Sequence, residues 1–344
     1  MSETHEPSSK LVAGELAFPD EDLEKTYYRV GIKGASMAVA KSALQKSIRR
    51  GDVEVATYWA AILLGSHKIA NLFNRLLTIA SEDIGPADDS ALVAVVEGYQ
   101  WYEKLRNGTY GGRGEWKRMR NVSGIRSTVD GLVRMLCASP KSRACDHACI
   151  GIIGPIFDGE DSVGKGNWIG AMGECAESRD STGALENLAR ALKADRSSLG
   201  AVLDSLGEMG CRTAVVAAKA IVSTKDRKAR PSFMPIVHGL FSAMHMGSDH
   251  GSAPIRNSAA IDELYRRILG TDPLTKSPDY AMDMHVRGVS KGAVRSFIES
   301  EHAALVPRVD PATVHFPEVE LYDRARGIGA TVRESSNMAA RKHK

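Results

Sequence analysis

The sequence predicts an all-α protein, an antiparallel helical bundle followed by a further helical region. Apolar residues recur at steps of three and four along most of the chain, and Gly, Pro and Asp stand where helices would begin or end. Patterns of strict alternation, which would indicate strands, are missing from the sequence. With 344 residues, of which 43% are apolar, the chain is long enough to bury a large core.

The first helix is expected at about residues 36–50. Met37 and Leu44 fall on one face of it, and Gly51 suits the left-handed position that ends many helices. Asp52 can then accept a hydrogen bond from the first turn of a second helix as its N-cap.

Four more helices are expected to follow the second. One runs from about Lys68 to Asp83 and ends at Gly85-Pro86, because proline cannot continue the ladder of backbone hydrogen bonds. Asp88 and Asp89 can cap the next. The last two are expected at residues 123–138 and 141–153.

Composition divides the chain into five segments. A flexible N-terminal arm (1–30) is followed by a helical domain (31–153) and a Gly-rich connector (154–182). A second helical region (183–305) and an extended basic C-terminal tail (306–344) complete the chain. Residues 106–121 interrupt the helical domain with four glycines and are expected to form a long loop. Helical patterns in the second region fall at residues 183–208, 211–223, 232–246, 257–269 and 291–304.

Three strings of residues in the helical domain stand in a recognisable order. They are SALQKSIRRGDVEVATYWAAILL at 42–64, RLLTIASEDIGPAD at 75–88 and ASPKSRACDHA at 138–148. Together they resemble the C-terminal domain of MgsA/RarA-type AAA+ ATPases, over about residues 36–150. The residues that match the family pattern are Ser42, Lys46, Arg49, Asp52, Trp59, Arg75, Glu82, Asp83, Gly85, Pro140, Lys141 and Ser142.

The resemblance implies a helical domain that assembles subunits into tetramers. It also implies work at replication forks and single-stranded gaps, alongside single-stranded-DNA-binding protein. Only about 35 residues precede the match, whereas those ATPases carry an AAA+ module there, so ATPase activity is not expected to carry over. A further string, DYAMDMHVRGVSKG at 279–292, is similar to an element of stand-alone phage-encoded relatives and suggests a viral or mobile-element origin.

A basic stretch with interleaved aromatic residues begins at residue 104. Cations can follow a phosphate backbone, and aromatic faces can stack on unpaired bases. The expected nucleic-acid contacts are Lys104, Arg106, Tyr110, Arg113, Trp116, Lys117, Arg118, Arg120 and Arg126. The alternative is a solvated basic loop whose aromatic residues pack on the adjacent helix.

Glu82 and Asp83 are adjacent carboxylates, a pairing that invites a general acid–base interpretation. Successive helical residues point about 100° apart, so the two are not expected to face one substrate. Carboxylates at a helix C-terminus are unfavourable, which predicts a structural salt-bridge cluster with Arg49, Arg50 or Arg75.

No catalytic residue, cofactor or metal is expected. GEDSVGKG at 159–166 approaches a P-loop, but Gly166 stands where a Mg²⁺-binding hydroxyl is needed, so a Gly-rich loop is the interpretation. His238 and His245, near Asp249 and His250, are two helical turns apart and too distant for one ion.

Bulk composition favours a cytoplasmic protein. The five cysteines are odd in number and form no CxxC pair, and neither a secretory leader nor a membrane-spanning apolar run is evident. The formal net charge of +3 is too mild to indicate nucleic-acid binding by itself.

The combined hypothesis is a non-enzymatic, oligomeric protein, a tetramer, that binds single-stranded DNA in preference to RNA. It would serve phage-like DNA replication, repair or transcription, in the host cytoplasm if viral, with replication or transcription proteins as further partners and no membrane. The alternative is a scaffold or clamp-loader-collar-like subunit that binds a replication ATPase or polymerase without contacting DNA.

Overall fold

The computed structural model describes residues 36–159, 162–164, 166–194, 199–210, 233–244 and 258–269, with the single residues 219, 280 and 305. Within these ranges the regular elements are helices and there is no β-strand, which confirms the predicted all-α class. None of the helices described combines the length and the apolarity that crossing a bilayer requires. The predictions for residues 1–30, 211–223 (apart from 219), 291–304 and 306–344 lie outside the described residues.

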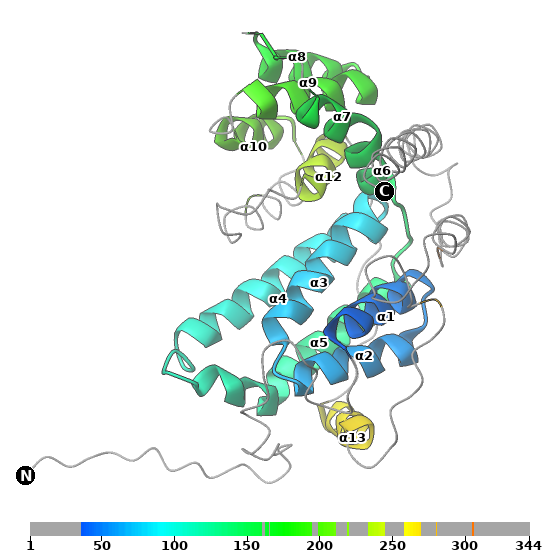
Figure 1. The fold of residues 1–344 in the computed structure, drawn as a ribbon, viewed down its shortest axis with the longest axis vertical. Helices are drawn as coiled ribbons and strands as arrows, with labels where there is room; N and C mark the ends of the chain where they lie inside the picture. Colours follow the sequence, from blue (N-terminus) through cyan, green and yellow to red (C-terminus); the bar gives the residue numbers. More distant parts are fainter. Residues whose placement is uncertain are drawn as a thin grey trace, which may run out of the picture.

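Six helices surround the first hydrophobic core. They are α1 (Met37–Arg49), α2 (Val53–Gly65), α3 (Ile69–Ile79), α4 (Asp89–Asn107), α5 (Ser123–Ala138) and, from far along the chain, α13 (Ser258–Leu269). α13 packs against α2 and α5 (Figure 1). Trp59, Phe73 and Tyr265 are fully buried in this core.

Three predicted helix-end residues, Gly51, Asp52 and Asp88, have the predicted roles. Gly51 has φ +67°, the left-handed conformation expected after α1. The Asp52 side chain accepts from the backbone N–H of Val55 at 3.2 Å, and Asp88 accepts from that of Ser90 at 3.1 Å.

The third helix differs from the expectation of an unbroken α-helix to Asp83. α3 ends at Ile79 and continues as a π-helical turn, η2 (Ala80–Ile84), and then a 3₁₀ turn, η3 (Gly85–Ala87). Gly85 has φ +52°, and a Cβ there would stand 3.3 Å from Cys145 Sγ. The chain therefore needs glycine at this position because another segment approaches it closely.

A second hydrophobic core is built by the helices that follow α5. They are α6 (Ala144–Ala148), a π-helical turn, η5 (Cys149–Ile153), α7 (Gly154–Asp158), α8 (Trp168–Glu177), α9 (Ser181–Ala194), α10 (Leu199–Glu208) and α12 (Met234–Ala243). In Figure 1 this group lies above the first, with α6 and α12 facing it.

The segment expected to be a Gly-rich connector, residues 154–182, instead contains α7 and α8. Met172 and Ala176 of α8 are buried in the second core, and α8 pairs with α9 as a helical hairpin. The glycine content of this segment suggested a loop, although its apolar residues are spaced as in a helix. The second helical region therefore begins at α6 rather than near residue 183.

Candidate nucleic-acid interface

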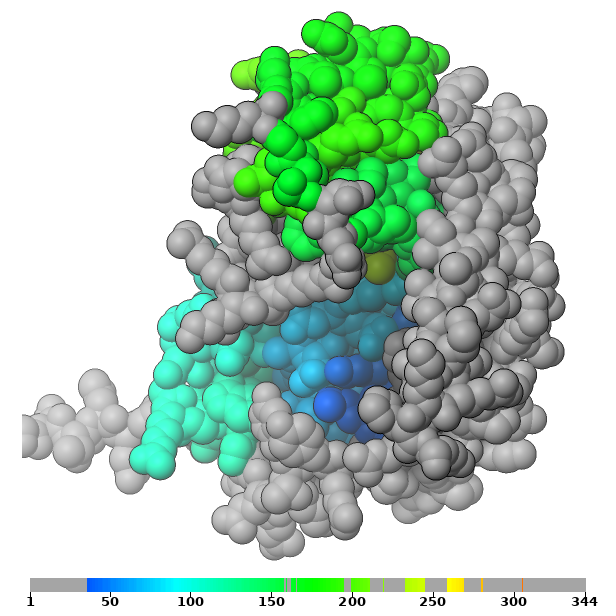
Figure 2. Space-filling view, turned by 45° about the horizontal axis from the view of Figure 1, so that its top comes forward, coloured from blue at the N-terminus to red at the C-terminus, as the bar shows by residue number. Residues whose placement is uncertain are grey.

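The segment after α4 carries most of the predicted nucleic-acid contacts. The structure differs from the predicted long loop, because α4 extends to Asn107 and a 3₁₀ helix, η4 (Glu115–Asn121), leads into α5. Only the glycine-rich residues between these two helices form a loop. Together, the end of α4 and this loop project at the lower left of the molecule in Figure 2.

Arg120 and Arg126 are removed from the predicted contact set. Both are buried, at 1% and 0% exposure. Arg120 Nη1 donates to the carbonyl oxygen of Gly65, the last residue of α2, at 2.9 Å, where the helix dipole favours a cation. Their guanidinium groups cannot meet a phosphate from inside the protein.

Arg126 instead joins three elements of the first core. Its Nη1 donates to the carbonyl of Arg120 at 3.1 Å, and its Nε donates to Asp262 Oδ1 of α13 at 2.8 Å. The two buried arginines therefore fix η4 onto α2 and α13, and the turn that carries Trp116 is anchored rather than loose.

The other cations of the predicted set lie at the surface. Lys104, Arg106, Arg113 and Arg118 are exposed, and Lys117 is half-buried. Arg106 pairs with Glu103 at 3.2 Å. Arg118 pairs with Glu115 at 3.4 Å. Solvent-exposed pairs of this kind contribute at most about 1 kcal/mol, so either arginine can exchange its carboxylate for a phosphate.

Helix geometry separates Lys104 from Arg106. Residues two positions apart on an α-helix point about 200° apart around its axis. The side chains of Lys104 and Arg106 therefore point in nearly opposite directions. Trp101 lies on the Lys104 side, and its ring touches the start of α5, where a Cβ on Gly124 would stand 3.3 Å from it. One continuous groove through the whole predicted set is therefore not formed.

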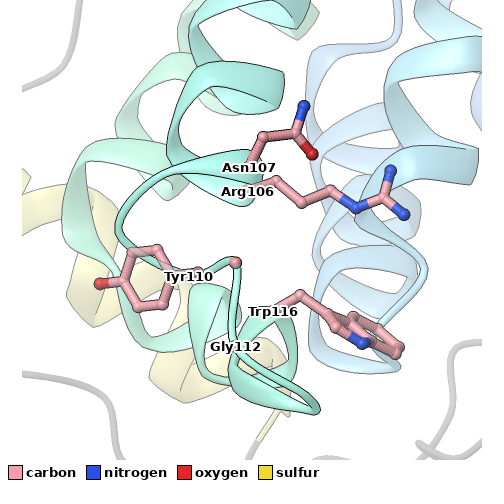
Figure 3. Close-up of a pocket in the computed structure, with 6 residues that line it drawn as sticks. Arg106, Asn107, Tyr110, Gly112 and Trp116 are labelled. Carbon is pink, nitrogen blue, oxygen red and sulfur yellow. The ribbon is translucent and has the colours of Figure 1, made fainter.

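The remaining group, which we call the basic rim, consists of Arg106, Arg113, Trp116, Lys117 and Arg118. Beside it lies an open hollow of about 260 Å³, lined by Arg106, Asn107, Tyr110, Gly111, Gly112 and Trp116. In Figure 3 the side chains of Arg106 and Trp116 extend in the same direction, whereas Tyr110 points the other way. Tyr110 is half-buried and packs on the first core. Of the two aromatic residues that line the hollow, Trp116, at 39% exposure, is therefore the one available to a ligand.

The predicted salt-bridge cluster around Glu82 and Asp83 is present. Arg49 donates to Asp83 Oδ1 through Nη2 at 2.7 Å and Nε at 2.8 Å. Gln45 donates to the other Asp83 oxygen at 2.7 Å and accepts from Arg75 at 2.7 Å. The pairing with Arg49 is thus confirmed, and Arg75 joins the cluster through Gln45.

Arg50 takes another place, with its guanidinium 4.1 Å from the Tyr280 ring centroid. Arg143, which spacing did not single out, completes the cluster by pairing with Glu82 at 3.3 Å and with Asp146. The feature of the sequence that could have indicated Arg143 is its position in the third family string, residues 138–148.

Glu82 and Asp83 lie near the same two cations, although successive residues of a regular α-helix point about 100° apart. Arg49 lies 3.7 Å from Glu82, and Arg143 lies 3.9 Å from Asp83, because each broad guanidinium spans both carboxylates. Burial, followed by repulsion from Asp83 and Asp146, raises the pKa of Glu82 to about 7 against the attraction of Arg143 and Arg49.

Residues 50–110 match the family model described as MgsA AAA+ ATPase C terminal. This segment belongs to the MgsA C-terminal family. The curated relatives that align with the chain include the following two. Replication-associated recombination protein A of Coxiella burnetii (strain RSA 493 / Nine Mile phase I) is 33% identical over 87 residues, which cover 25% of this chain and 20% of the relative. ATPase WRNIP1 of Dictyostelium discoideum is 42% identical over 60 residues, 17% of this chain and 7% of the relative.

The chain thus spans a fifth or less of either relative, so the match describes a segment and not a whole activity. No solved structure matches the chain. Within the MgsA segment lie α2, α3 and α4, the Glu82–Asp83 turn and Arg106. The rest of the basic rim, from Arg113 to Arg118, follows the matched residues.

The family-pattern residues around the MgsA segment serve the fold. Trp59 is fully buried in the first core. Lys46 Nζ donates to Ser42 Oγ at 3.1 Å, and Ser142 Oγ accepts from the N–H of Ala144 at 3.1 Å.

Lys141, which follows Pro140, is fully buried at the end of α5. Its Nζ donates to the carbonyls of Cys137 at 2.9 Å and Ser139 at 2.5 Å. Burial lowers the pKa of Lys141 to about 8. This lysine therefore satisfies carbonyl groups at the C-terminus of α5 inside the protein.

The remaining candidates hold no site among the described residues. His238 Nε2 lies 2.7 Å from Asp89 Oδ1, which also accepts from Ser242 Oγ at 2.8 Å, so this buried group joins α12 to α4. No group of His, Cys, Asp or Glu in the part that the structure describes is arranged to hold a metal ion. His245, Asp249 and His250, with Glu160, Asp161 and Lys165 of the P-loop-like string, lie outside the described residues.

Proposed function

We propose that this protein binds single-stranded nucleic acid at the basic rim, without catalysis, as an oligomeric accessory factor in DNA replication and recombination. Single-stranded DNA is the favoured ligand over RNA. The proposal keeps Arg106, Arg113, Trp116, Lys117 and Arg118 from the residues predicted by sequence, and assigns Arg120 and Arg126 to the support beneath them.

The observation that carries the proposal is an exposed indole among cations. Burying an aromatic ring is strongly favourable, yet Trp116 remains 39% exposed on an anchored turn. Arg106, Arg113 and Arg118 surround it in sequence and are themselves exposed. An aromatic face and neighbouring guanidinium groups are what sequence-tolerant binding of unpaired strands requires.

The relatives support the setting of the proposal. One of them is named for replication-associated recombination and the other as an ATPase, and the residues that match the MgsA family model include Arg106. Assembly of several copies would multiply a few weak phosphate contacts through effective concentration, which a chain with a net charge of only +3 needs. The phage-like setting, and a role in transcription, stay predictions.

The test is binding of a labelled single-stranded oligonucleotide at two salt concentrations. The wild-type chain should lose affinity as salt rises, with a slope of about 0.7 in log K per phosphate contact. The variant Arg106→Glu/Arg113→Glu/Arg118→Glu should not bind. A matched control, Lys219→Glu/Arg266→Glu/Arg267→Glu, changes the net charge equally at positions that do not belong to the rim and should keep most of the affinity.

A second candidate is a scaffold or collar-like subunit that binds a replication ATPase or polymerase and does not touch DNA. It is favoured by the glutamates that already pair with Arg106 and Arg118. Salt-insensitive or absent oligonucleotide binding by a folded wild-type chain would select this candidate. Equal loss of binding in the rim variant and the control would place the site elsewhere.

A further inference from the structure

Trp116 lies against His67, a residue that no motif in the sequence indicates. The two rings are perpendicular, at 83°, with their centroids 6.4 Å apart. His67 Nδ1 lies 3.1 Å from the carbonyl oxygen of Lys117, so this nitrogen donates and its tautomer is set by the contact. One imidazole therefore touches both the indole and the backbone next to it.

The backbone at His67 has a conformation that residues other than glycine seldom adopt. His67 has φ +57°, and it is one of two residues other than glycine with positive φ in the described ranges; the other is Arg179. The conformation ends α2, because it allows the N–H of Lys68 to donate to Leu63 at 2.9 Å. Glycine would take this position with less strain, so what histidine adds is the ring.

Arg106 offers a second contact to a ligand in the hollow beside Trp116. Arg106 and Trp116 extend in the same direction in Figure 3, and both line the hollow. The turn beneath them cannot swing freely, because Arg120 is bonded to the end of α2, two residues before His67. The indole thus has fixed supports at its ring and at its backbone.

We propose that His67 is a positioning residue that holds Trp116 beside Arg106, so that the hollow is a preformed subsite for one unpaired base and its phosphate. The base stacks on the indole and the phosphate meets the Arg106 guanidinium. His67 itself touches no nucleic acid. This inference rests on the proposed function and specifies the ligand unit that the basic rim takes.

The geometry selects for unpaired strands. A base in a duplex has both faces covered by its neighbours, whereas a base in a single strand can present a face to the indole. Every base has such a face, so the subsite tolerates any sequence. A preformed platform also avoids the entropic cost of ordering the tryptophan during binding.

The experiment compares the full-length wild type, Trp116→Ala, His67→Gly and Arg179→Gly, with labelled oligothymidylate as the probe. Trp116→Ala should weaken binding about 5- to 150-fold, the range of lost base–aromatic stacking. His67→Gly should weaken it about 2- to 12-fold, because the indole must then be ordered on binding. Arg179→Gly relieves the same backbone strain at the end of α8 and should leave affinity unchanged.

A merely structural role for His67 predicts a different pattern. If His67 positions Trp116, the melting temperature of His67→Gly should equal or exceed that of the wild type, because glycine suits φ +57°. Acrylamide quenching of tryptophan emission should nevertheless increase. If His67→Gly does not fold, His67→Asn decides by the same criteria, since asparagine also tolerates this conformation.

The outcomes separate the two proposals. If the wild type does not bind the probe, the proposed function fails and the inference fails with it. If Trp116→Ala weakens binding but His67→Gly matches the wild type, the function stands and the positioning role is overturned. Equal weakening in His67→Gly and Arg179→Gly would also overturn it, because backbone relief alone would then be the cause.

Discussion

Two groups of arginines stand in opposite surroundings in this protein. Arg49 and Arg143 are held with Glu82, Asp83 and Asp146 at the turn between the two cores. The arginines of the basic rim lie in solvent, at 44% side-chain exposure for Arg106 and 56% for Arg118. The same side chain therefore stabilises the fold in one place and is available for a ligand in the other, and the difference lies in burial and in the number of carboxylates nearby.

The largest expected effect comes from breaking the buried group. Arg49→Met should lower the free energy of unfolding by about 3–5 kcal/mol, because it leaves the fully buried Asp83 carboxylate short of its cation. Urea denaturation measures this. Arg118→Met, the exposed counterpart, should change stability by less than about 1 kcal/mol, and comparable losses in the two variants would remove the contrast.

The buried arginines below the rim should give the next effect. Arg126→Met removes the bond to Asp262 and the bond to the Arg120 carbonyl, which predicts a loss of about 1.5–3 kcal/mol and earlier proteolysis at α13. An unchanged proteolysis pattern would show that α13 is held by other contacts.

A pH dependence follows from the raised pKa of Glu82. Its pKa is raised to about 7 in the folded protein, above the value of about 4.3 in an unfolded chain. Between these values the folded state binds the proton that the unfolded state has released, so stability should fall as pH rises from about 5 to about 7.

Glu82→Gln should flatten this slope, by an amount on the order of 1 kcal/mol over the window. Thermal melts of both proteins across that pH range provide the measurement. A steeper slope in the variant, or stability that rises with pH through the same range in the wild type alone, contradicts the assignment.

The smallest effect on stability is expected at the rim itself. Arg113→Ala should leave the unfolding free energy within about 0.5 kcal/mol but reduce the salt slope of single-strand binding by about 0.7. A change in stability without a change in slope would show that Arg113 supports the fold and does not contact the strand.

Local patterns were sufficient for much of the first core. Helical periodicity, Gly51, Asp52 and Asp88 placed the helices between α1 and α5, because caps and apolar spacing act within one or two turns. The pairing of Arg49 with Asp83 was within reach because carboxylates at a helix C-terminus are unfavourable unless cations lie nearby, and Arg49 was one of three candidates.

Distant partners explain what the sequence could not reveal. Arg126 and Arg118 look alike in a basic run, but only Arg126 meets Asp262, a residue 136 positions away. The support of Trp116 by His67 likewise joins the end of α2 to η4, and no spacing rule connects them. The Gly-rich composition of residues 154–182 outweighed the apolar spacing of α8 for a similar reason, since its burial depends on α9.

Photocrosslinking of a single strand that carries iodouracil, followed by mass spectrometry of the peptides, tests the location of binding most directly. We expect the principal adduct on Trp116, and its loss in Arg106→Glu/Arg113→Glu/Arg118→Glu. Adducts confined to Trp101 or to segments outside Arg106–Arg118, with none on Trp116, would contradict it.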